Sequence, residues 1–67
     1  MIYYVNNTPQ EAAEIRTVAE VMTDLQLAGK RGLAVAVNDT VVAQPEWASY
    51  TLQSNDRVTI IRATQGG

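Results

Sequence analysis

One segment of this chain has helical periodicity, and the apolar segments around it are short and strand-like. In the helical segment the apolar residues recur at intervals of three and four and therefore share one helix face: Val18, Val21, Met22 and Leu25. Thr17 and Glu20 have the spacing of a capping box at the start of this stripe. We expect a helix over residues 18–28, ended by Gly29 as its C′ residue, with Lys30 and Arg31 near the negative helix end.

The strand-like segments lie on both sides of this helix. Residues 1–5 are apolar on both alternating faces, which favours a strand covered on parts of both sides. Residues 33–38 alternate large with small side chains, and the turn pair Asn38-Asp39 leads into residues 40–42, which completes a hairpin. Residues 57–63 form the final strand, which we expect beside the first strand in the middle of the sheet.

Residues 9–14 allow two interpretations. Thr8-Pro9-Gln10-Glu11 has the sequence of a helix start, and local propensity would allow one helix from Pro9 to Ala28. The second start signal at Thr17 argues that the helix begins later. We therefore expect a short edge strand over residues 9–14.

The order of these elements predicts an α+β fold. One main helix packed on one face of a mixed sheet of four to five strands is an economical arrangement for 67 residues. We expect one domain over residues 1–63 and a flexible C-terminal tail over residues 64–67. Trp47 lies in a turn or 3₁₀ segment, and we expect it to plug the core with its indole N–H on a carbonyl; a binding hot spot is the alternative.

Composition excludes several classes of function. The chain has no cysteine and no histidine, which removes the thiolate nucleophile, the usual general base and the commonest metal ligands. The net charge is −2 and the five basic residues are scattered, so we expect no nucleic-acid partner. No apolar run approaches ~18 residues and no signal peptide is evident, so we expect no membrane contact and a cytoplasmic location. We expect no metal site and no enzymatic activity of its own.

The final residues, Gly66 and Gly67, follow the last strand closely. Glycine has no side chain, so such an end can enter a narrow channel and present a carboxylate there. The alternative is an ordinary frayed terminus.

The chain resembles the ThiS family, the sulfur carriers of thiamin thiazole biosynthesis, over its whole length. Five features carry the resemblance: Val5-Asn6-Asn7, Thr17-Val18-Ala19-Glu20, Ala34-Val35-Ala36-Val37-Asn38, Trp47-Ala48 after a proline, and the terminal Gly66-Gly67. The resemblance implies the ubiquitin-like β-grasp fold. It also implies that Gly67 is the reactive residue and that the slim Gly66 lets it enter partner active sites.

The family's chemistry implies three partners and no bound cofactor. An E1-like adenylating enzyme of the ThiF type would use Mg-ATP to adenylate the terminal carboxylate, and a sulfur donor protein would convert it to a thiocarboxylate. Thiazole synthase, of the ThiG type, would then take the sulfur. The carrier would act as a co-substrate of these enzymes.

We expect partner docking on the tail and on the sheet face away from the helix. By alternation that surface comprises Ile2, Tyr4, Ala34, Ala36 and Ile61, to which Gln65 and Gly66 of the tail are added. Arg62 points the other way and is not assigned to it. The alternative is that these are scattered surface apolar residues.

Two other functions stay open. The chain could carry sulfur or act as a ubiquitin-like modifier for another pathway, such as molybdopterin, cysteine or tRNA thiolation. It could also be a β-grasp interaction module whose Gly-Gly end is incidental.

Overall fold

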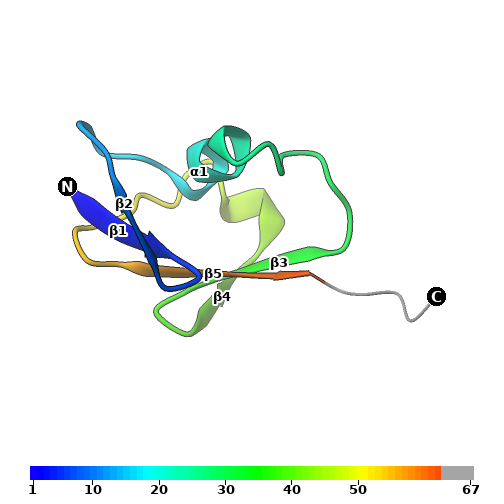
Figure 1. Ribbon diagram of the computed structural model, residues 1–67. Coiled ribbons are helices and arrows are strands. Elements are labelled where there is room, and N and C mark those ends of the chain that lie inside the picture. The colour runs from blue at the N-terminus through cyan, green and yellow to red at the C-terminus, as the bar shows by residue number, and fades with distance from the viewer. Residues whose placement is uncertain (63–67) are drawn as a thin grey trace.

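The computed structural model describes residues 1–62, which form a five-stranded sheet with one α-helix packed on one face (Figure 1). In chain order the elements are β1 (Ile2–Val5), β2 (Thr8–Glu11), α1 (Val18–Asp24), β3 (Leu33–Val37), β4 (Thr40–Val42), the 3₁₀ turn η1 (Gln44–Glu46) and β5 (Arg57–Arg62). The order across the sheet is β2-β1-β5-β3-β4. Strand β5 runs parallel to β1 and antiparallel to β3. The expected mixed sheet, with the last strand beside the first in its middle, is confirmed.

Two tight hairpins join neighbouring strands, β1 to β2 and β3 to β4. Their two-residue loops are Asn6-Asn7 and Asn38-Asp39, and all four residues have positive φ. Positive φ at both central positions is the type I′ geometry that matches the twist of a hairpin. Asn and Asp tolerate this region better than other non-glycine residues, which explains why these pairs make the turns.

Strand β2 settles the ambiguous segment. It begins at Thr8, ends at Glu11 and pairs antiparallel with β1, so the single long helix from Pro9 is wrong and the edge strand is confirmed with shifted bounds. Pro9 has no N–H to donate, but β2 lies at the edge of the sheet, so the hydrogen-bond ladders between the inner strands are not interrupted.

The start of α1 agrees with the sequence. Thr17 Oγ1 accepts from the Glu20 N–H at 3.2 Å, and Glu20 Oε1 accepts from the Thr17 N–H at 2.8 Å. The Val18 N–H donates to the Tyr50 carbonyl and the Ala19 N–H to the Trp47 carbonyl, both in the segment that follows η1. These bonds satisfy donors that a helix start leaves free, and they fix α1 to the segment after β4.

The end of α1 differs from the sequence prediction. The helix ends at Asp24, and Gln26 takes the C′ position with φ 61°. The Leu27 N–H donates to the Met22 carbonyl and the Gln26 N–H to that of Thr23, which is a Schellman motif. Gly29, with φ 84°, lies in a later turn and does not end the helix. Accordingly, Lys30 and Arg31 are not in the last helical turn.

The core lies between α1 and the sheet. From α1 it takes Val18, Val21 and Met22, and from the sheet alternate residues of β1, β3 and β5 such as Tyr3, Val35 and Val58. Trp47 is buried and its Nε1 donates to the Val42 carbonyl at 2.8 Å, so the predicted core plug is confirmed.

The other face of the sheet has no covering layer among the described residues. Ile2 on this face is 42% exposed and Tyr4 is half-buried, so the expected cover on parts of both sides of β1 is wrong for Ile2. The helix between residues 18 and 24 is too short to cross a membrane, and the part of the chain that the structure describes has no other α-helix.

Candidate functional site at the end of strand β5

Strand β5 brings the chain toward its C-terminus through the centre of the sheet. Its start lies beside β1, where Arg57 is opposite Tyr4 and Val58 opposite Val5. Its later residues run past the end of β1 but stay paired with β3, as far as Arg62 opposite Leu33. The last described residues are thus held by backbone pairing on the β3 side.

Asn6 continues the support of β5 on the β1 side. Its Oδ1 accepts a hydrogen bond from the Ile60 N–H at 2.9 Å, and its backbone N–H donates to the Val58 carbonyl. The side chain therefore takes the place that a further residue of β1 would have. This bond joins residues 54 positions apart, so no local pattern in the sequence predicts it.

The open face near the end of β5 is apolar. The strand register places Ala34 beside Ile61, and Ala36 beside both Thr59 and Val41. Ile61 is 51% exposed and Ala34 is also exposed, whereas Ala36 is only 7% exposed. Ala36 lies on the predicted face, but its neighbours leave little of it for a partner to touch.

Val41 is the residue on this face that sequence analysis missed. It is 71% exposed and lies directly across from Ala36 on the edge strand β4. Alternation along the short segment 40–42 could have indicated it, because Val42 faces the core. We call Ala34, Val41 and Ile61 the tail-end apolar patch.

Ile2 and Tyr4 occupy the far part of the same face. The register of β1 with β5 places Ile2 about six residues before the level of Ile61, which corresponds to roughly 20 Å along a strand. Arg57 and Thr59 lie between them on this face. The five predicted docking residues therefore share a face but form two groups.

The three predicted tail residues, Gln65, Gly66 and Gly67, lie outside the described residues, as does the expected boundary between residues 63 and 64.

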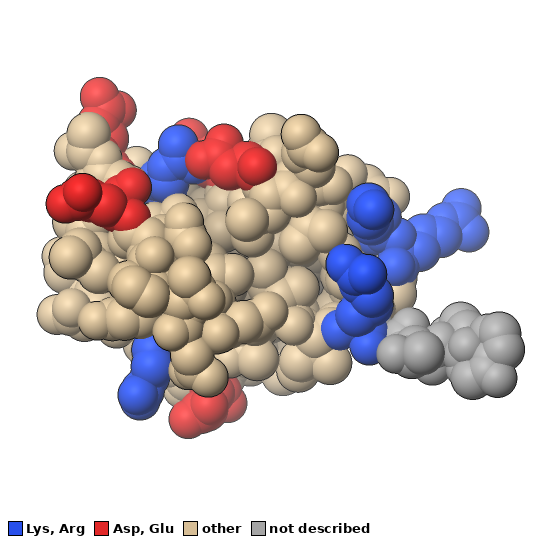
Figure 2. Space-filling view, in the orientation of Figure 1, with Lys and Arg blue, Asp and Glu red and all other residues tan. Residues whose placement is uncertain are grey.

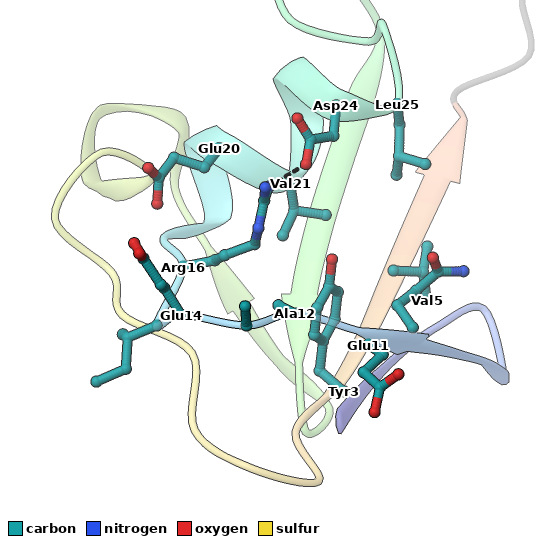
Figure 3. A pocket seen from close by; sticks show the side chains of 13 residues that line it. Tyr3, Val5, Glu11, Ala12, Glu14, Arg16, Glu20, Val21, Asp24 and Leu25 are labelled. Carbon is teal, nitrogen blue, oxygen red and sulfur yellow. Dashed lines mark hydrogen bonds and ion pairs between the residues drawn. The ribbon is translucent and has the colours of Figure 1, made fainter. Parts of the chain in front are cut away.

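A groove of about 470 Å³ lies at the opposite edge of the sheet, between α1 and the chain from β2 to Arg16 (Figure 3). Its lining combines apolar residues such as Tyr3 and Val21 with the ion pair of Arg16 and Asp24. None of its lining residues belongs to β3, β4 or β5. It is thus separated by β1 from the strand that leads to the tail.

The described residues were compared with two common features of ligand sites, a cluster of metal-ligating side chains and a buried polar atom without a partner. Residues 1–62 contain no group of three or more acidic side chains placed to hold a metal ion. Every buried side-chain polar atom among them has a hydrogen-bond partner, so none is left aimed at a missing ligand.

Comparison with known proteins identifies the family of the chain. The sequence profile of the ThiS family matches residues 3–67. The chain belongs to the ThiS family. It is also similar to the sulfur carrier protein ThiS of Escherichia coli, with 27% identity over 62 residues that cover 92% of each chain.

Solved ThiS structures have the same fold. The crystal structure of the thiamine biosynthesis protein ThiS from Geobacter metallireducens superposes with a TM-score of 0.84 at 26% identity, with full coverage of both chains. Its solution structure gives a TM-score of 0.78 and is covered to 88%. The family resemblance and the β-grasp fold that the sequence implied are both confirmed.

Proposed function

We propose that this ThiS-family chain is a sulfur carrier of thiamin biosynthesis, with Gly67 as the residue that carries the sulfur. The observation that supports this most strongly is the family match over residues 3–67, which includes Gly66 and Gly67. The similar proteins bear the names sulfur carrier protein and thiamine biosynthesis protein.

The proposed chemistry begins with activation of the Gly67 carboxylate. A carboxylate is a poor electrophile because its negative charge is delocalised over two oxygens and neither is a good leaving group. An E1-like adenylating enzyme of the ThiF type attaches AMP from Mg-ATP and releases pyrophosphate. Sulfide supplied by a donor protein then attacks the acyl carbon, AMP leaves, and a thiocarboxylate remains on the carrier.

Thiazole synthase, of the ThiG type, is the proposed recipient of this sulfur. A thiocarboxylate tethered to a protein is delivered to the recipient without release of free sulfide. In this scheme the carrier is a co-substrate, and the acids, bases and nucleotide site belong to its partners. The central position of β5, paired with β3 as far as Arg62, supports this role because it gives the reactive end a fixed base.

Removal of Gly67 tests the proposal directly. The chain is incubated with its organism's ThiF-type enzyme, Mg-ATP and a sulfide source, and its intact mass is measured. The full-length chain should replace one oxygen by one sulfur at its C-terminus, and the chain without Gly67 should remain unchanged. Residues 1–62 do not include the deleted position, so the thermal unfolding curves of both chains should coincide.

The replacement Gly67→Ala is the subtler variant, because it keeps the carboxylate but adds a methyl group beside it. We expect it also to abolish sulfur transfer, since a Cβ widens a chain end that must enter a narrow channel. Normal transfer by the shortened chain would contradict the carrier function. Loading followed by transfer to a different recipient, with none to thiazole synthase, would instead assign the carrier to another pathway.

A further inference from the structure

Positive charge gathers at the end of the molecule where the described chain stops (Figure 2). Three of the five basic residues belong to this end: Lys30 and Arg31 in the loop before β3, and Arg62 at the end of β5. We call these three residues the basic collar. All three are exposed.

The fold brings the collar together from two distant segments. Arg62 lies opposite Leu33 in the β3–β5 ladder, and the loop with Lys30 and Arg31 leads directly into Leu33. Leu33 packs against the core, so by strand alternation Arg62 is on the helix side of the sheet. The tail-end apolar patch, with Ile61, is on the other side.

Acidic residues are absent from both segments that form this end. The sequence has no Asp or Glu in residues 25–38 or in residues 57–67. The acidic side chains lie away from this end, some of them around α1 and β2 and the others elsewhere on the surface (Figure 2). A chain with a net charge of −2 therefore has a cationic end.

The length of the tail limits what the collar can reach in a complex. Gly67, the proposed reactive residue, lies five positions after Arg62, and five residues span at most ~17 Å. If the terminal carboxylate enters an active site along a channel, the collar stays near the mouth of that channel. It then faces the protein surface around the entrance rather than the nucleotide at the far end.

We propose that the basic collar docks on an acidic rim around the tail channel of the activating enzyme and accelerates their encounter. This inference rests on the proposed function for the channel and its enzyme. Opposite charges across the rim of an interface act mainly on the association rate and on its dependence on salt. The collar also fixes orientation, because the acidic residues elsewhere on the carrier would repel the same rim.

The test uses the full chain, the purified ThiF-type enzyme of the same organism, and the double variant Lys30→Glu with Arg31→Glu. At low salt the association rate should fall roughly tenfold, and high salt should bring the rates of the two carriers together. Arg57→Glu is the control, because it makes a charge reversal on the open face away from the collar. It should change the rate less than threefold, and circular dichroism should show all variants folded.

Steady-state loading adds a second readout. The double variant should raise the KM for the carrier and leave the KM for ATP unchanged. A raised KM for ATP alone would overturn the proposal, because the cations would then act on the nucleotide. Equal association rates for the double variant and the unaltered chain would overturn it too, and so would an equal loss in Arg57→Glu.

The chain without Gly67 separates this inference from the proposed function. It should keep the salt-dependent association although it cannot be loaded. If the unaltered chain is loaded but charge reversal in the collar has no effect, the collar proposal fails and the carrier function stands. If the chain is not loaded yet the double variant loses its salt-dependent association, the carrier function fails and the collar remains a docking surface.

Discussion

The two faces of the sheet carry similar apolar residues but hold them in different environments. On the face under α1, five alternate residues of the three inner strands are almost completely buried: Tyr3, Val5, Val35, Val37 and Val58. On the open face, Ile2, Val41 and Ile61 are 42%, 71% and 51% exposed. Alternation along a strand therefore directs some apolar residues into the core and others to the open face.

This contrast separates what stabilises the fold from what is available to a partner. Burial of apolar area contributes about 25 cal/mol per Å², and the covered face accounts for most of that burial. The exposed residues of the open face keep their apolar area in contact with water. A partner that covers them removes this apolar area from water, and that burial contributes to the free energy of binding.

The largest expected effect is on the covered side, at Trp47. Trp47→Ala should lower the free energy of unfolding by about 3–5 kcal/mol, because it removes a buried indole and leaves a cavity. Such a loss is a large share of the stability of a small domain. Denaturant unfolding followed by circular dichroism measures it.

Trp47→Phe is the matched control for that substitution. It keeps most of the apolar bulk but removes the N–H that donates to the Val42 carbonyl, which should cost about 1–3 kcal/mol. Similar losses in both variants would mean that the hydrogen bond dominates. No loss in either would contradict the assignment of Trp47 to the core.

Local patterns in the sequence were sufficient for most of the fold. The capping box at Thr17 and the turn pair Asn38-Asp39 are short-range signals, and both were found in the structure. The end of α1 was not predictable in the same way. Gln26 adopts positive φ in a position where glycine is favoured, and Gly29 three residues later supplied a stronger but misleading signal.

The site depends on contacts between segments far apart in the chain, so the sequence predicted it less completely. Alternation assigned Ala36 and Ile2 to the correct face. It could not show that Ala36 is covered by its neighbours, or that Ile2 lies far from Ile61, because both depend on strand register. The basic collar depends on register as well, because the pairing of β5 with β3 places Arg62 beside the loop that leads into β3.

On the open face, Ile61→Asp should weaken binding to the ThiF-type enzyme roughly tenfold, equivalent to about 1.4 kcal/mol. A charge placed against an apolar partner surface must lose its water without gaining a partner. The free energy of unfolding should change less, since half of this side chain is already exposed. Isothermal titration calorimetry and a denaturant unfolding curve measure the two effects.

Ile2→Asp provides the control on the same face, at a site of comparable exposure but far from the tail. We expect it to bind almost normally. Equal weakening by both variants would show that the partner covers the whole face, as alternation alone suggests. Full affinity in Ile61→Asp would remove the tail-end apolar patch from the docking surface.

The smallest expected effect concerns Asn6, whose side chain supports the central strand β5. Asn6→Gly keeps the positive φ of 49° but deletes the Oδ1 that accepts from the Ile60 N–H. Stability should fall by about 1 kcal/mol, and hydrogen exchange at the Ile60 amide should accelerate more than at other β5 amides. Asn7→Gly is the control, because Asn7 also has positive φ but its side chain makes no hydrogen bond to β5 within residues 1–62. If Ile60 exchanges at the same rate in both variants, the last residues of β5 are held by β3 alone, and the base of the tail depends on one neighbouring strand instead of two.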